Sequence, residues 1–147
     1  MNKGEETFGS VYFAIYGAVV FIFGVVEFVA TVTGGITGGI LDTSGAFDPM
    51  FLPWRAIILV TAGLLYLSSV KKFAEIGQLA KAVVASIMIW IVAGSAIWAR
   101  IAASIPAEEG WFNTLEDFLA SYAPPYCPAL LLLLPSLVII YYIKKES

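Results

Sequence analysis

Histidine is absent from this chain of 147 residues, and cysteine occurs once, as Cys127. Without histidine, the chain has no bis-histidine haem site, none of the usual zinc sites and no Ser-His or Cys-His catalytic arrangement. A single cysteine excludes a disulfide within the chain, so any bridge would join two chains. These absences argue against an electron carrier or a hydrolase of familiar design. They predict no cofactor, no metal site and a function that is not enzymatic, although carboxylates and hydroxyls keep a membrane enzyme open.

Charged residues are also scarce. They make up 13% of the chain, whereas 60% of the residues are hydrophobic, and the mean hydropathy is +0.89. A soluble domain usually has about 25% charged and 45–50% apolar residues. The composition therefore predicts an integral membrane protein in contact with the lipid bilayer. The net charge of −3 is small, which argues against nucleic acid as a partner.

The sequence contains long apolar runs. Each span of a bilayer needs about 20 apolar residues, and four stretches meet that length: residues 8–32, 51–70, 82–103 and 125–143. We therefore predict an all-α integral membrane protein, a four-transmembrane-helix bundle that forms a single membrane domain over residues 1–147. The first stretch follows a start of mixed charge and is much longer than the roughly 7–15 apolar residues of a signal peptide. We expect it to be a retained helix.

The polar connection before the last stretch contains a further helical pattern. Asn113 and Glu116 have the spacing of a capping box. Apolar residues then recur at i, i+3, i+4 and i+7, namely Leu115, Phe118, Leu119 and Tyr122. This predicts a short amphipathic interfacial helix over residues 113–122. Two placements stay open: flat on the membrane surface, or folded onto the loops of the bundle.

A glycine repeat follows the first apolar stretch. Residues 33–40 read T-G-G-I-T-G-G-I, with glycines at Gly34, Gly35, Gly38 and Gly39. Glycine is a poor helix former, so we expect the helix to end here and a flexible loop to begin. The loop is either an ordinary connection or a gate whose carbonyls line a water-filled path.

Proline occurs inside the last apolar stretch, as Pro135. Its ring removes one backbone donor and frees a carbonyl one turn earlier, near Leu131. The sequence therefore predicts a helix kink. The freed carbonyl either accepts a hydrogen bond from a neighbouring helix or serves as a hinge or ion ligand.

The lysines predict the orientation in the membrane. With four spans, one side holds every lysine, while the opposite loops hold most of the acids and no basic residue; the lysines are Lys3, Lys71, Lys72, Lys81, Lys144 and Lys145. Basic residues accumulate in cytoplasmic loops. We therefore expect a multi-pass protein of the cell membrane with both termini in the cytoplasm.

Stripes of small residues mark the expected packing faces, because small side chains let helices approach closely. In the first stretch, the stripe recurs every seven residues, at Ser10, Gly17, Gly24 and Thr31. Similar faces of small and polar residues occur in the second and third stretches. Three such stripes are more than an isolated bundle needs, which favours association with further helices.

Each of these three faces carries one charge: Glu27, Arg55 and Arg100. By helical rise, all three lie within roughly 8 Å of the outer boundary of the apolar core. They form a predicted charged cluster near the outer face. Two interpretations stay open. The cluster is either a structural ion pair beside the aromatic belt, or a site whose surplus positive charge binds an ion or an anionic small molecule.

The expected function follows from these features. The first hypothesis is a non-catalytic membrane protein that acts as an accessory or oligomerising component, either as a homo-oligomer or with other membrane subunits. The alternative is a small channel or transporter that uses Glu27, Arg55 and Arg100 as an outward-facing site, with the glycine loop as its gate.

Overall fold

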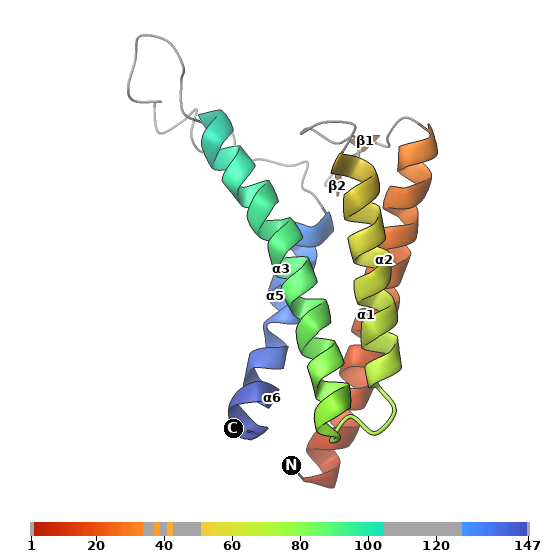
Figure 1. Ribbon diagram of the computed structural model, residues 1–147, viewed down its shortest axis with the longest axis vertical. Coiled ribbons are helices and arrows are strands. Elements are labelled where there is room, and N and C mark those ends of the chain that lie inside the picture. Colours follow the sequence, from red (N-terminus) through yellow and green to blue (C-terminus); the bar gives the residue numbers. More distant parts are fainter. Residues whose placement is uncertain (1, 34–36, 39–40, 43–50, 105–127, 147) are drawn as a thin grey trace.

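The computed structural model describes residues 2–33, 37–38, 41–42, 51–104 and 128–146. Within these ranges the chain is all-α apart from one pair of two-residue strands (Figure 1). The elements in chain order are α1 (Lys3–Thr33), β1 (Thr37–Gly38), β2 (Leu41–Asp42), α2 (Phe51–Ser69), α3 (Ile76–Ser104), α5 (Pro128–Ser136) and α6 (Val138–Glu146).

Among the described residues, three segments are long and apolar enough to cross a membrane: Lys3–Thr33, Ile76–Trp98 and Pro128–Lys145. The third runs through both α5 and α6. The apolar part of α2, Pro53–Ser69, is shorter. The structure thus supports an all-α protein with three candidate spans and a location in the membrane. The fourth predicted span, in α2, and the topology stay predictions.

Two helices begin earlier than the apolar pattern predicts. The first begins at Lys3 instead of residue 8, and α3 begins at Ile76 instead of residue 82. Local capping explains the first difference. The backbone N–H of Asn2 donates to Glu5 Oε2 at 3.1 Å, and the backbone N–H of Glu5 donates to the carbonyl of Asn2 at 3.0 Å. Such capping allows a polar turn to precede the apolar one.

The glycine repeat contains structure that the sequence did not predict. Strand β1 pairs with β2 in antiparallel register, with Thr37 opposite Asp42 and Gly38 opposite Leu41. Gly38 lies in β1 opposite Leu41 of β2, and its role in a gate stays a prediction. Gly34, Gly35 and Gly39 lie outside the described residues, as does the predicted interfacial helix over residues 113–122.

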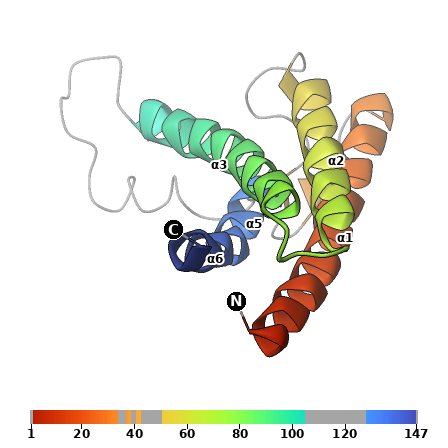
Figure 2. The same cartoon turned by 60° about the horizontal axis from the view of Figure 1, so that its bottom comes forward.

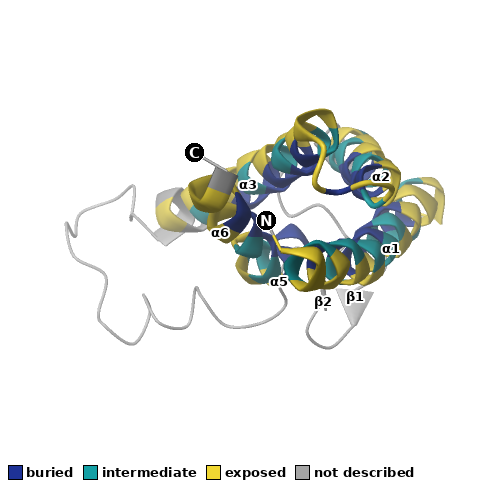
Figure 3. Cartoon of the chain, turned by 90° about the horizontal axis from the view of Figure 1, so that it is seen from below, coloured by how far each residue is buried: buried dark blue, intermediate teal, exposed yellow. Residues whose placement is uncertain are grey.

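Helices α1 and α2 lie side by side along most of their length (Figures 1 and 3). Three glycines allow this approach, because a Cβ on any of them would meet the other helix. A Cβ on Gly17 would lie 2.7 Å from Cβ of Tyr66, one on Gly24 2.6 Å from the backbone N of Val60, and one on Gly63 2.7 Å from the backbone of Phe21. The stripe through Gly17 and Gly24 is confirmed as the packing face of α1.

Aromatic side chains fill the core toward the end where both termini lie (Figure 1). Phe13 of α1 stacks on Tyr66 of α2, with ring centroids 5.5 Å apart, and on Phe73 in the α2–α3 connection, at 5.3 Å. Phe73 also meets the ring of Tyr142 edge-on at 5.2 Å. These rings join α1, α2 and α6, so this end of the bundle is closed by packing.

The termini are also linked by polar contacts. Lys145 of α6 forms an ion pair with Glu5 of α1, and the hydroxyl of Tyr142 donates to the carbonyl of Glu5 at 3.2 Å. At the opposite end, α3 leans away from α1 and α2 (Figures 1 and 2). The bundle is therefore tight at the terminal end and splayed at the other.

The glycine packing predicts the effect of one added methyl group. We expect Gly24→Ala to lower the free energy of unfolding by about 1–3 kcal/mol, because the new Cβ overlaps the backbone of α2 and forces the helices apart. The measurement is unfolding in detergent micelles titrated with sodium dodecyl sulfate.

Gly94→Ala is the matched control, since a Cβ on Gly94 in α3 meets no atom within 4 Å. Alanine there should leave the protein as stable or more stable by up to about 1 kcal/mol, because alanine favours helix over glycine. Equal effects of the two substitutions would contradict the packing argument.

Candidate functional site

The charged side chains of α1 and α2 meet near the splayed end. Glu27 lies six residues before the end of α1, and Arg55 lies four residues after the start of α2. Nη2 of Arg55 donates to Oε1 of Glu27 at 2.7 Å. The Glu27 side chain is completely buried, and that of Arg55 is 14% exposed. The pair therefore lies inside the interface between α1 and α2.

Local packing explains why the two side chains meet. Gly24 precedes Glu27 by one helical turn and lies against Leu59 and Val60 of α2. This close contact places Glu27 beside the first turns of α2, within reach of Arg55. A distance of 2.7 Å is that of a charge-assisted hydrogen bond.

Burial makes the pair energetically demanding. Removing a carboxylate and a guanidinium from water costs several kcal/mol for each ion, and mutual attraction offsets this only with good geometry. Oε2 of Glu27 is buried and has no hydrogen-bond partner among the described residues. Oε1 is thus hydrogen-bonded and Oε2 is not. We infer that the pair fixes the register of α1 against α2 and adds little net stability.

The third predicted member of the cluster cannot be placed. The backbone of Arg100 belongs to α3, but its side chain lies outside the described part of the structure. The structure thus brings together Glu27 and Arg55, while the three-residue cluster stays a prediction. Of the predicted gate glycines, only Gly38 is described, in β1.

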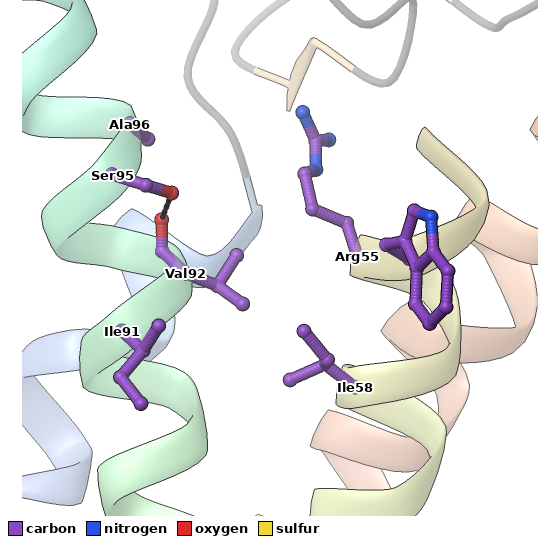
Figure 4. Close-up of a pocket in the computed structure, with 7 residues that line it drawn as sticks. Arg55, Ile58, Ile91, Val92, Ser95 and Ala96 are labelled. Carbon is purple, nitrogen blue, oxygen red and sulfur yellow. Dashed lines mark hydrogen bonds between the residues drawn. The ribbon is translucent and has the colours of Figure 1, made fainter. Parts of the chain in front are cut away.

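A pocket of about 210 Å³ lies between α2 and α3 beside Arg55. Apart from Arg55 and Ser95, its lining is apolar, from Trp54, Ile58, Ile91, Val92 and Ala96. Figure 4 shows the guanidinium of Arg55 at the same end of the pocket as Ser95, with Ile58 and Ile91 at the other end. The hydroxyl of Ser95 donates to the carbonyl of Val92 at 2.8 Å. The pocket therefore has a polar end and an apolar end.

The last helix is interrupted near Pro135, and carbonyls of this segment accept hydrogen bonds from α1. Helix α5 ends at Ser136 and α6 begins at Val138, so the interruption lies at Leu137. Two tyrosine hydroxyls of α1 reach this segment. Tyr16 donates to the carbonyl of Leu132 at 2.6 Å, and Tyr12 donates to that of Pro135 at 2.8 Å. The accepting carbonyls are thus those of Leu132, next to Leu131, and Pro135, and both accept from a neighbouring helix.

Two further polar contacts between helices were missed from the sequence. Nε1 of Trp90 donates to Oγ of Ser136 at 2.6 Å, which ties α3 to α5. Tyr66 of α2 and Ser86 of α3 share a hydrogen bond at 2.5 Å. The available signal was the tyrosine, tryptophan and serine content of the apolar stretches, because a buried hydroxyl or indole N–H usually finds a partner. The partners themselves could not be read from one sequence.

No group of three potential metal ligands occurs among the residues that the structure describes. Comparison of the chain with protein-family models, with curated proteins and with solved structures finds no match.

The buried ion pair can be tested by a double-mutant cycle. We expect Glu27→Leu to lower the free energy of unfolding by about 3–5 kcal/mol, because it leaves a guanidinium without its buried counter-ion. Glu27→Leu combined with Arg55→Leu should cost less than the sum of the two single changes, with a coupling energy of roughly 0.5–3 kcal/mol. The measurement is unfolding in mixed micelles.

The control for this cycle is the ion pair between Lys72 and Glu75, whose side chains are well exposed. Glu75→Ala should change stability by at most about 0.5 kcal/mol, because exposed pairs contribute little. Strict additivity of Glu27→Leu and Arg55→Leu would mean that the two groups do not interact in the folded protein.

Proposed function

We propose that the chain is a four-span protein of the cell membrane with both termini in the cytoplasm. Support comes from the arrangement of the helices, since α1 and α3 run away from the terminal end and α2 and α5–α6 return to it (Figure 1). Every lysine therefore belongs to the terminal end, as the positive-inside rule requires of a cytoplasmic side. In a Cys127→Ser background, a thiol reagent that cannot cross membranes should label Thr33→Cys from outside intact cells, but not Ala74→Cys.

We further propose that the protein is a non-catalytic membrane component that assembles with other membrane helices, first of all with a second copy of itself. The single observation that carries this proposal is the outer face of α1. Apolar residues recur there with alternating steps of three and four over the whole helix: Phe8, Val11, Ile15, Ala18, Ile22, Val25, Val29 and Val32. All but Ala18 are exposed.

This spacing is the heptad pattern with which two helices pack side by side. Most of its members are valine and isoleucine, whose branched side chains are stiff and lose little freedom on packing. The stripes of small residues do not supply this interface, because they are occupied within the chain: Gly17 and Gly24 pack on α2, and Ala82, Ser86 and Ala93 are buried. The face opposite the glycines is the one left for a partner.

The charged pair supports a structural role as well. Arg55 holds the Glu27 carboxylate inside the α1–α2 interface, which supports a role for this pair in maintaining the fold. A structural role for the pair agrees with a component whose activity is assembly.

The association is tested by crosslinking. In a Cys127→Ser background, we expect Ile22→Cys to form a disulfide-linked dimer in native membranes on mild oxidation, because the heptad face brings two copies of α1 together. The measurement is the fraction of dimer on a non-reducing gel.

Leu134→Cys in the same background is the control, since this side chain is 72% exposed on α5 and lies off the heptad face. It should stay monomeric under the same oxidation. A monomeric Ile22→Cys protein, or equal crosslinking at both positions, would refute association through α1.

A small channel or transporter is the second candidate. The observation that favours it is the asymmetry of the bundle, because the aromatic rings close the terminal end while a pocket beside Arg55 lies toward the splayed end. One measurement separates the two candidates. Purified protein in liposomes should move an ion or a small anion, and lose this flux in Glu27→Gln, only if the transporter hypothesis holds.

A further inference from the structure

The connection between α2 and α3 brings basic side chains to the terminal end of the bundle (Figure 1). Lys71 and Lys72 belong to the connection, and Lys81 follows five residues after the start of α3. We call these three residues the connection lysines. Between residues 70 and 81 the chain has these three lysines and one acid, Glu75, which gives a net charge of +2.

Most of this positive charge is not neutralised within the part of the chain that the structure describes. The ammonium group of Lys71 has no hydrogen bond or ion pair there. Lys81 donates one hydrogen bond, at 3.0 Å, to the neutral amide oxygen of Gln78. Lys72 pairs with Glu75 at 3.1 Å, but both side chains are well exposed, and exposed pairs are weak. The connection lysines are therefore open to an external anion.

Packing fixes the backbone that carries the first two lysines. The ring of Phe73 is fully buried and stacks on that of Phe13 in α1, with centroids 5.3 Å apart. Oγ of Ser10 in α1 donates to the carbonyl of Val70 at 3.2 Å. The two lysines between Val70 and Phe73 are both exposed. An anchored backbone thus presents their ammonium groups to the surroundings.

The backbone of Lys72 is in the left-handed region, with a φ of 58°. Glycine and asparagine adopt this conformation more readily than lysine does. Such strained conformations persist where the surrounding structure enforces them, and they cluster at functional sites. A function of the ammonium group accounts for a lysine at a position whose backbone suits glycine.

The connection lies at one end of a candidate membrane span. That span of α3 begins at Ile76, whose side chain is 80% exposed. Lys81 lies within the first turns of the span, where a lysine extends its ammonium group toward the headgroups and keeps its stem among apolar groups. Apolar contact together with several basic groups is the combination that binds an anionic lipid surface.

We propose that the connection lysines bind anionic phospholipid in the leaflet at the terminal end, with their ammonium groups on its phosphate oxygens and Ile76 against its acyl chains. Basic segments directly outside a span attract anionic headgroups in this way. The inference requires α3 to be a span. It requires neither the proposed orientation in the membrane nor the association of α1 with a second copy.

The test is native mass spectrometry of the protein released from nanodiscs that contain equal amounts of phosphatidylglycerol and phosphatidylcholine with the same acyl chains. Both leaflets contain both lipids, so the result does not depend on the topology. We expect the unaltered protein to retain phosphatidylglycerol in preference. Lys71→Gln should reduce this preference about fivefold, because each basic residue near an anionic surface contributes a factor of that order.

Lys3→Gln is the matched control. Lys3 is also exposed and belongs to the terminal end, but it lies outside the connection, and its replacement changes the net charge by the same amount. It should leave the preference unchanged. Equal reductions by Lys3→Gln and Lys71→Gln would overturn the site, because the preference would then follow net charge alone. The absence of any preference in the unaltered protein would overturn it as well.

Lys72→Asn separates lipid binding from folding. Asparagine tolerates the left-handed backbone better than lysine, so this variant should resist unfolding by sodium dodecyl sulfate at least as well as the unaltered protein. It should nevertheless lose about fivefold of the preference for phosphatidylglycerol, because one ammonium group is gone. A stable variant that keeps the full preference would overturn the role of Lys72.

Inorganic phosphate tests whether the ligand is a lipid. At constant ionic strength, it should not displace phosphatidylglycerol, because it has no acyl chain to contact Ile76. Displacement would overturn the lipid site and identify a soluble anion as the ligand.

Discussion

The close contact between α1 and α2 is the constraint on which the rest of the structure depends. Gly17, Gly24 and Gly63 remove the side chains that would hold the two helices apart. The resulting approach excludes water and lipid from the interface, and only in such an interface can a fully buried carboxylate be retained by an arginine. The same approach leaves the opposite face of α1 unoccupied, which directs that face toward lipid or a partner helix.

Away from this interface, aromatic rings and tyrosine hydroxyls hold the helices together. Phe13, Phe73 and Tyr142 fill the space between α1, the α2–α3 connection and α6 at the terminal end. Tyr12 and Tyr16 span the distance from α1 to the interrupted last helix. A polar group in a membrane interior needs a partner within the protein. The break at Leu137 is therefore accompanied by hydroxyl donors from another helix.

The pocket beside Arg55 follows from the same geometry. Helix α3 leaves α2 toward the splayed end, and the space that opens is lined by short aliphatic side chains. Arg55 lines this pocket together with Ser95 and pairs with Glu27 on the α1 side. One residue thus serves the helix interface and the pocket.

Composition and periodicity alone indicated the helical class, the location in the membrane, the packing face of α1 and a cluster of three charges, Glu27, Arg55 and Arg100, whereas the pairing of Glu27 with Arg55 came from the structure. These features follow from local rules, since apolar length sets a span and small residues at a seven-residue spacing set a face. The early starts of α1 and α3, the β1–β2 hairpin at Gly38 and the carbonyl partners of Tyr12 and Tyr16 were decided only by the tertiary structure. The cap and the hairpin are local features that apolar periodicity does not report. The tyrosine contacts join segments far apart in the chain, and a single sequence carries no record of which distant groups meet.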